Sequence, residues 1–555
     1  MLNWRIWVDR RGLRGDLFGG VTAAIVSLPL ALAFGVASGA GPEAGLYGAV
    51  LVGFWAALFG GTRTLISEPT GPMTLMMATV MTRLAATHPE EAWALGFAVV
   101  VLAGIFQMLF GFLKLGRYVT LMPYSVISGF MSGIGVTLVL LQVAPLLGHV
   151  TPAGGAAAVL MALPEMLREV RPIEAALGLS SLAVLFLQPV AWRRFVPPQL
   201  VVLLLGTLLA WFFLADSDLR LIGSLPGGLP SLRLPIVSPN LIGVVLVDAL
   251  LLAMLGCVDT LLTAMVADSL TRSQHDSNRE LMGQGIANIV SGLFGGLPGA
   301  GATMGTVVNI QSGATTPRSG MIRALTLLVA ILLAAPLLEN VPMAVLAAIT
   351  FKVGVDILDW SFLRRAHRVS YAATFIMYGV LILTVLVDLM VAVGIGVFIA
   401  NVITIERLAR VQSNYVRIVD PASDLSLPMR DVEKELFDQA QGKVVIFHLS
   451  GPMIFGVAKA IAREHRVSQG ARILIVDLGD VPLLSTTIAL AIENVILDTQ
   501  AEGLRVIVAG ANGKVLSRLE GLGVVGKGAS TISAATREEA LRCALSLLRK
   551  DAAVN

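Results

Sequence analysis

Charged residues are scarce in this sequence: they make up 14% of its 555 residues, whereas 56% are hydrophobic and the mean hydropathy is +0.81. A soluble globule needs more polar surface than this, so the scarcity excludes one as the fold of the whole chain. The net charge is only +3, which gives no case for a nucleic-acid partner. The composition predicts a polytopic α-helical membrane protein.

Cysteine is almost absent as well. Cys257 and Cys543 are too few and too far apart in sequence for a disulfide scaffold or a metal site. The sequence also lacks the phosphate-binding Gly-x-x-x-x-Gly-Lys-Ser/Thr motif, the His-Glu-x-x-His motif and any paired-cysteine motif. We therefore expect neither an enzyme nor a bound cofactor. A cleavable signal peptide is not expected either, because the first apolar segment leads directly into further ones.

About fourteen hydrophobic segments follow one another along residues 1–410, and several are too short to span a bilayer unaided. Short segments suit a fold with broken helices, and their spacing predicts seven segments plus seven, the second half inverted relative to the first. The segments are expected at residues 17–37, 44–60, 65–82, 94–113, 119–147, 173–191, 197–214, 241–267, 281–296, 298–312, 321–338, 341–356, 372–387 and 389–405.

Lysine and arginine residues indicate the orientation of these segments. If the N-terminus lies inside, the cytoplasmic loops carry most of the basic residues, including Arg318 and Arg323. The external loops then carry few, among them Arg83. Both termini are therefore predicted to be cytoplasmic.

One apolar segment is interrupted by the stretch Gly299-Ala-Gly-Ala-Thr-Met-Gly-Thr306, which follows Pro298. Glycine destabilises a helix and proline removes a backbone donor, so we expect a broken helix whose second half starts near Gly301. Unwound backbone at membrane depth must line a cavity or be buried in protein. The free N–H groups of the second half would point at an anion. Alternatively, Gly301 and Gly305 serve only close helix packing.

A second interruption lies at Leu65-Ile-Ser-Glu-Pro-Thr-Gly-Pro-Met-Thr74, where a half-helix is expected from Met73 to Val80. Each interruption falls in roughly the third hydrophobic segment of its half. Paired interruptions at corresponding positions point to the binding site of a transporter. Two half-helix N-termini are thus predicted to face each other near the membrane midplane.

Asp259 lies inside the apolar run 250–266. An ionisable residue at membrane depth is costly and indicates function. Thr263 follows at i+4, so its hydroxyl shares a helix face with the carboxylate, and both are suitable ligands for a hard cation. Backbone carbonyls near Gly301 could complete such a site. The alternative is a buried aspartate that is hydrogen-bonded for packing only.

The two interrupted stretches carry no compensating basic residue: no lysine or arginine lies between Gly285 and Thr316, or between Thr64 and Thr82. An anion held there would meet the negative charge of Asp259 unless a Na⁺ ion or a proton neutralised it. This arrangement favours cation-coupled anion uptake.

Three further acidic residues are interpreted as structural. Glu68 is predicted to brace its broken helix through backbone N–H groups, in a supporting role. Asp248 and Asp388 lie near segment ends and are expected at the membrane interface.

The composition changes after Arg410. Residues 411–430 are expected to form a linker that contains an extended piece at Tyr415–Val419. Alternating strands and helices then predict a small α/β domain at residues 431–555. Its strands are expected at 443–449, 473–478 and 504–509, and its helices at 454–465, 488–500, 515–522 and 538–548.

Four stretches of the chain resemble the SulP anion transporter family, and in particular its Na⁺-dependent bicarbonate transporters. These stretches are Leu65–Thr74, Pro123–Gly133, Gly299–Gly313 and Phe351–Trp360. The resemblance implies a bacterial inner-membrane symporter with a seven-plus-seven inverted repeat, in which a core domain moves against a gate domain. It also implies a cytoplasmic STAS domain that contributes to a homodimer.

Matched motif by motif, the resemblance assigns ligand contacts. It implies bicarbonate contacts at Thr70 and Ala302, and Na⁺ contacts at Asp259, Thr263, Gly301 and Thr303. Animal relatives often place a basic residue near the second half-helix. This chain has none there, which fits cation coupling and not simple exchange.

The resemblance to STAS domains is looser. Where antagonist STAS domains carry Asp-Ser-Ser-Gly at a phosphorylated helix start, this chain has Ser485-Thr-Thr-Ile488. Phosphorylation at Thr486 is therefore not expected, and a role in dimerisation or regulatory contact is favoured.

The sequence predicts Na⁺-coupled uptake of inorganic carbon as bicarbonate, with membrane lipid as the surrounding partner. The alternatives are a proton-coupled or exchanging transporter of another anion such as sulfate, an anion channel, and a membrane-tethered signalling protein.

Overall fold

The structure is a computed structural model that divides into two compact units, Met1–Val397 and Phe398–Asn555, each described here by itself. Most of the predicted linker lies outside the described residues, so the boundaries predicted at 410 and 431 stay predictions. The structure describes residues 12–116, 123–152, 154–189, 197–213, 217–223, 230–232, 242–387, 391–392, 395–396, 398–399, 401–406, 416–419, 429–453, 470–526 and 529–554.

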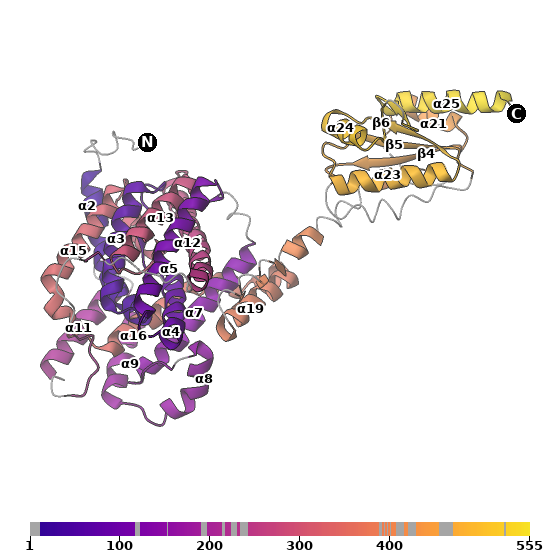
Figure 1. The fold of residues 1–555 in the computed structure, drawn as a ribbon. Helices are drawn as coiled ribbons and strands as arrows, with labels where there is room; N and C mark the ends of the chain where they lie inside the picture. Colours follow the sequence, from indigo (N-terminus) through magenta and orange to yellow (C-terminus); the bar gives the residue numbers. More distant parts are fainter. Residues whose placement is uncertain are drawn as a thin grey trace. The chain divides into compact units, whose positions relative to one another are not determined.

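The first unit is a bundle of helices in which α2, α3 and α15 pack side by side (Figure 1). Among the described residues, α2, α3, α5, α7 and α12 are long and apolar enough to cross a membrane. The helices are α2 (Leu13–Ala37), α3 (Pro42–Phe59), α4 (Gly71–Thr87), α5 (Ala92–Phe112), α7 (Tyr124–Leu146), α8 (Gly155–Met166), α9 (Pro172–Leu187), α11 (Pro198–Phe213), α12 (Ile242–Thr271), α13 (Ser277–Leu293), α14 (Thr303–Gln311), α15 (Arg318–Leu338), α16 (Met343–Ile357), α17 (Trp360–Leu363), α18 (Ala366–Val369) and α19 (Tyr371–Leu386).

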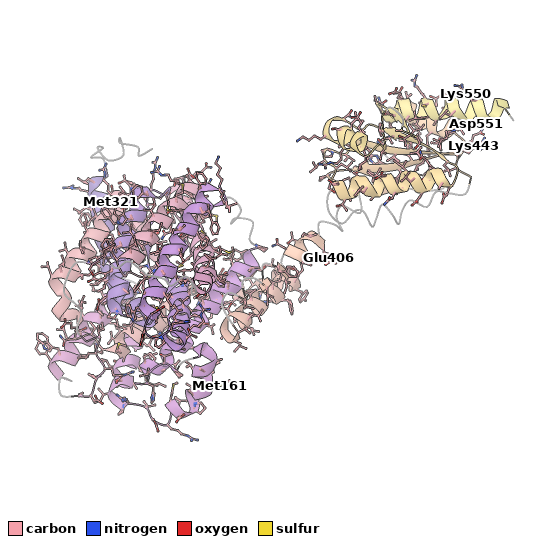
Figure 2. All side chains as sticks on the ribbon, viewed as in Figure 1. Met161, Met321, Glu406, Lys443, Lys550 and Asp551 are labelled. Atoms are coloured by element: carbon pink, nitrogen blue, oxygen red, sulfur yellow. The ribbon has the colours of Figure 1, made fainter. Side chains whose placement is uncertain are left out.

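The helix α8 was not among the expected segments. It is short, and its residue Met161, which is 82% exposed, lies at the edge of the unit (Figure 2). With 12 residues, this helix does not reach the length of a membrane span.

Both predicted helix breaks are confirmed. The strand β1 (Ser67–Glu68) precedes α4 and the strand β2 (Ala300–Gly301) precedes α14. The two strands pair antiparallel, with Ser67 opposite Gly301 and Glu68 opposite Ala300. Two helices, a short strand and a half-helix thus recur in the same order, as α2-α3-β1-α4 and α12-α13-β2-α14. The antiparallel pairing fits two halves of inverted orientation.

Glycines let α13 pack tightly on α5. A Cβ atom on Gly104 would lie 2.5 Å from the carbonyl oxygen of Gly285, and a Cβ atom on Gly285 would lie 2.5 Å from that of Gly104. Only glycine at both positions allows the two backbones to approach this closely. This close packing fixes α13 against α5.

The structure corrects one assignment that rested on charge pattern. Arg323 is not a loop residue: it lies in α15 and its side chain is fully buried. Asp248 is 2% exposed and forms an ion pair with Arg83, and its place at the membrane interface stays a prediction. Counting charges along a sequence cannot show that a buried partner will neutralise them. Asp388, the other acidic residue predicted at the membrane interface, lies outside the described residues.

The second unit contains a five-stranded sheet in the order β3-β4-β5-β6-β7. β3 is antiparallel to β4, and the remaining neighbours are parallel. The strands are β3 (Val416–Val419), β4 (Val444–Ser450), β5 (Ile473–Asp480), β6 (Arg505–Ala509) and β7 (Ile532–Ala534), and the helices are α21 (Asp431–Gln439), α23 (Thr486–Ala501), α24 (Gly513–Gly521) and α25 (Arg537–Val554).

Apolar residues from both faces of this sheet are buried, those of one face against α23 and α24 and those of the other against α21 and α25. The α/β prediction is confirmed for its three expected strands and its last three helices, and the predicted extended piece is β3. The predicted helix at 454–465 lies outside the described residues. Thr486 is the exposed first residue of α23, whose N-cap is Ser485.

A buried charge cluster lies at the carboxyl end of the sheet, on the α25 face. Asp477 Oδ2 accepts a hydrogen bond from Arg537 Nε (2.7 Å) and lies 2.8 Å from His448 Nδ1. Burial raises the pKa of Asp477, but the hydrogen bond from His448 and the charge of Arg537 outweigh it and hold that pKa below its ordinary value. The charged form of Asp477 therefore stabilises the folded unit.

Arg537→Gln is expected to lower the free energy of unfolding of this unit by about 2 kcal/mol at pH 7, because a charged hydrogen bond is lost. A depressed carboxyl pKa contributes stability above the ordinary pKa of about 3.9 and loses it at lower pH. The difference in the free energy of unfolding between the variant and the native unit should therefore become smaller below about pH 4. Urea denaturation of a fragment spanning residues 411–555 measures both values. Arg542→Gln, on the same helix and 65% exposed at its side chain, is the control and should change little; equal losses for both variants would contradict the argument.

Candidate functional site

The two half-helices begin at Thr70 and Ala302, which are the N-caps of α4 and α14. Neither N-cap side chain makes a capping hydrogen bond. The first N–H groups of a helix have no partner within the helix, and its N-terminus carries partial positive charge. Two such ends lie next to the same pair of strands, and this arrangement suits an anion.

Four oxygen atoms predicted to face a cation come from α12, β2 and α14. The hydroxyl oxygen of Thr263 lies 2.8 Å from the carbonyl oxygen of Gly301 and 2.9 Å from the hydroxyl oxygen of Thr303. Asp259 lies one turn before Thr263 on α12 and is 7% exposed. Thr303 is the exposed member of the set, so the cluster opens to its surroundings at that residue.

The predicted cation and anion residues touch each other. The hydroxyl of Thr70 donates a hydrogen bond of 2.7 Å to Asp259 Oδ2. Thr70 begins the first half-helix and Asp259 belongs to α12, so this bond joins the two parts of the site directly. A change of charge at Asp259 therefore alters a hydrogen bond made by the N-cap residue of α4.

A side chain at Gly301 would crowd α12. A Cβ atom there would lie 3.0 Å from Cβ of Thr263 and 3.2 Å from Cα of Thr260. The N–H group of Gly301 donates to the hydroxyl of Thr260 (3.1 Å), and the N–H group of Ala302 donates to the carbonyl of Ile66 (2.8 Å). The strand is thus held so that the Gly301 carbonyl faces Thr263.

Asp259 is the least compensated of the buried carboxylates in the described part of this unit. The carboxylates of Glu68, Glu174 and Asp248 pair with arginines. Those of Asp16 and Glu280 each accept two backbone N–H bonds. Asp259 accepts one hydroxyl bond, from Thr70. A buried charge needs a charged or strongly hydrogen-bonding partner, so this residue calls for a cation or a proton.

Three buried amide side chains, which the sequence analysis did not select, hold the backbone of Gly299 just before β2. Asn288 binds both backbone groups of Gly299: its Nδ2 donates to the Gly299 carbonyl (3.0 Å) and its Oδ1 accepts from the Gly299 N–H (2.8 Å). Gln284 also donates to that carbonyl (2.9 Å), and Gln107 accepts from Asn288 (2.8 Å). The i, i+4 spacing of Gln284 and Asn288 inside an apolar segment was the available signal.

Glu68 does not brace its helix through backbone N–H groups as predicted. Its carboxylate instead pairs with the guanidinium of Arg323, and both side chains are buried. The supporting role predicted for Glu68 has this ion pair as its structural basis.

The sulfate permease family pattern matches residues 13–380, and the STAS domain pattern matches residues 438–538. The bicarbonate transporter BicA of Picosynechococcus sp. is 55% identical to this chain over 96% of the chain and 95% of its own length. The solved transmembrane domain of a cyanobacterial bicarbonate transporter BicA is 59% identical, with a TM-score of 0.67, over 70% of this chain and 98% of that one.

The structure of SLC26A9 is similar over 99% of this chain and 93% of its own, with a TM-score of 0.83. Its identity of 17% shows the fold alone. Together these similarities confirm the predicted fold: a multi-pass helical membrane unit followed by a STAS domain.

Proposed function

Since the chain belongs to the sulfate permease (SulP) family, and is therefore a membrane anion transporter and not an enzyme, we propose that it is a Na⁺-coupled bicarbonate symporter. The anion is held between the first turns of α4 and α14. The Na⁺ ion is held by Asp259, Thr263, Gly301 and Thr303. Na⁺ is here a transported substrate that moves with the anion.

The observation that carries Na⁺ coupling is the weak compensation of Asp259. A carboxylate in this position repels an anion bound at the adjoining helix ends, and no lysine or arginine lies in the stretch from Gly285 to Thr316 to offset it. A Na⁺ ion beside Asp259 removes the repulsion and adds an attraction. Each ligand then raises the affinity for the other, which is the thermodynamic basis of symport.

The charge balance favours a monovalent anion. One Na⁺ ion neutralises Asp259, so the partial charges of two helix ends have to stabilise the bound anion. Bicarbonate then leaves one negative charge in a buried site, whereas sulfate leaves two, and the cost of burying charge rises steeply with its magnitude. The 55% identity to a protein called a bicarbonate transporter supports the same choice.

The proposal extends to the membrane setting. Both termini lie in the cytoplasm in this proposal, with the helical unit in the bacterial inner membrane, and the distribution of basic residues along the sequence supports this orientation. The site alternates between the two sides as the core helices move against the gate helices. Two copies form a homodimer to which the STAS domain contributes.

Uptake by purified protein in lipid vesicles tests this function. Labelled bicarbonate should accumulate when Na⁺ is higher outside than inside, and labelled sulfate should not. Accumulation driven by external acid without Na⁺ would indicate proton coupling. Sulfate accumulation would indicate another substrate, a flux too fast for a transport cycle would indicate a channel, and the absence of any concentrative uptake would leave a signalling role.

Removal of the STAS domain is expected to leave anion preference unchanged. All proposed ligands lie in the first unit, so truncation after Glu406, just beyond the last predicted membrane segment at 389–405 (Figure 2), removes none of them. The ratio of bicarbonate to sulfate uptake should stay within about twofold of the native ratio, while the yield of dimer on size-exclusion chromatography falls. A truncated protein that assembles but changes its anion preference would contradict this prediction.

A further inference from the structure

Arg323 joins four elements at one buried point. Its Nε donates to the hydroxyl of Ser27 in α2 (2.9 Å), and its Nη1 donates to the carbonyls of Ala49 in α3 (3.3 Å) and Ser67 in β1 (3.1 Å). Its Nη2 donates to Glu68 Oε2. The guanidinium of an α15 residue therefore holds both residues of β1, immediately before the first half-helix.

The partner carboxylate also lies against the second half-helix. A Cβ atom on Gly305, in the first turn of α14, would lie 3.1 Å from Glu68 Oε1. One oxygen of Glu68 thus faces Arg323 and the other faces the turn whose N–H groups are proposed to bind the anion. A carboxylate in that position is itself an anion beside a helix N-terminus.

We propose that Arg323 is a positioning residue for the anion half of the site. By neutralising Glu68 and holding it on the β1 side, Arg323 keeps this carboxylate from taking the N–H groups of α14 in place of the transported anion. It also leaves Asp259 as the carboxylate whose charge Na⁺ has to balance. This inference rests on the proposed function, since it concerns the same anion site.

The proposal predicts a specific pattern among charge variants. In Arg323→Gln the Glu68 carboxylate loses its counter-charge and competes for the first turn of α14. The half-saturating bicarbonate concentration should rise at least tenfold, while Na⁺ binding measured without anion stays within threefold of the native value. In the double variant Glu68→Gln with Arg323→Gln the competing charge is gone, so bicarbonate half-saturation should return to within threefold of native.

The experiment measures bicarbonate uptake kinetics and Na⁺ binding on the full chain in lipid vesicles, normalised to protein that elutes as a single folded species. Arg83→Gln is the matched control, because Arg83 also pairs with a buried carboxylate, Asp248, but lies near the C-terminal end of α4, the end away from β1. It should leave bicarbonate half-saturation unchanged. Arg323→Lys keeps the positive charge, so its half-saturating bicarbonate concentration should stay within threefold of the native value. This variant decides the question if Arg323→Gln does not fold.

A purely structural role predicts the opposite ranking, since the double variant would then be as impaired as Arg323→Gln or more so. That result, or a raised half-saturation in Arg323→Lys equal to that of Arg323→Gln, would overturn the inference. Native protein whose uptake does not depend on Na⁺ would instead refute the proposed function, so the two failures are distinguishable.

Discussion

Replacing Asp259 with asparagine is expected to abolish the Na⁺ dependence of bicarbonate uptake while the protein stays folded. Two unit charges about 4 Å apart interact by about 4 kcal/mol at an effective dielectric constant near 20, so Na⁺ affinity should fall by a factor on the order of 10² to 10³. Asparagine keeps the volume and an oxygen that can accept the hydrogen bond from Thr70. The loss should therefore be one of charge and not of packing.

The same substitution should have a second, opposing effect. Because coupling between two ligands is reciprocal, the Na⁺-dependent gain in bicarbonate affinity is lost with the Na⁺ ion. The repulsion of the anion by the carboxylate is lost as well, so a weak, Na⁺-independent anion binding should remain. A simply inactive or unfolded protein would lack this residual binding.

Uptake against Na⁺ concentration at fixed pH, with native protein and Asp259→Asn side by side, measures this effect. Asp248→Asn is the matched control: it lies on the same helix, about three turns away on the same face, and its carboxylate already has Arg83 as a partner. It should keep the native Na⁺ dependence. If Asp259→Asn also kept the native Na⁺ dependence, Asp259 would not be a ligand of the cation.

The second large effect is expected at Ala302, the N-cap of α14. Ala302 is 9% exposed and directly precedes the first-turn residues of α14, whose N–H groups have no partner within that helix. In Ala302→Leu the larger side chain should exclude the anion, and overpacking by 1–3 kcal/mol corresponds to roughly a 5- to 150-fold loss of bicarbonate affinity. Na⁺ binding without anion should change much less, because the Gly301 carbonyl and Thr263 stay in place.

Bicarbonate affinity of Ala302→Leu and Ala302→Gly, measured on folded protein, checks this expectation. Glycine is tolerated at a helix N-cap and is smaller than alanine, so that variant should bind the anion nearly as well as the native protein. Unchanged affinity in Ala302→Leu would place the anion elsewhere.

The sequence was sufficient for features that depend on local chemistry. Proline and glycine near Pro69 and Gly301 predicted both helix breaks, because each stretch holds several of these helix-destabilising residues close together. A single one is tolerated, as Pro29 is inside α2. The i, i+4 spacing of Asp259 and Thr263 predicted a shared face, and the structure brings Thr263 together with Gly301 and Thr303 as expected. The ligand roles of these residues stay predictions until binding is measured.

Features that depend on distant partners could not be predicted in the same way. Arg323 meets Glu68 across 255 positions of sequence, and Thr70 meets Asp259 across 189. The charge pattern therefore assigned Arg323 to a loop, although the fold buries it completely. Asn288 was overlooked for a different reason: its partner Gly299 is only 11 positions away, but an amide side chain that binds unwound backbone has no motif of its own.

The movement of Na⁺ itself tests the central claim most directly. Vesicles containing the native protein, strongly buffered and with equal Na⁺ on both sides, are given an inward bicarbonate gradient, and the entry of labelled Na⁺ is followed. Symport predicts that Na⁺ accumulates above its external concentration with bicarbonate, does not do so with sulfate, and fails to do so in Asp259→Asn. Bicarbonate uptake that requires Na⁺ but carries none with it would show Na⁺ to be an activator, and would contradict the account.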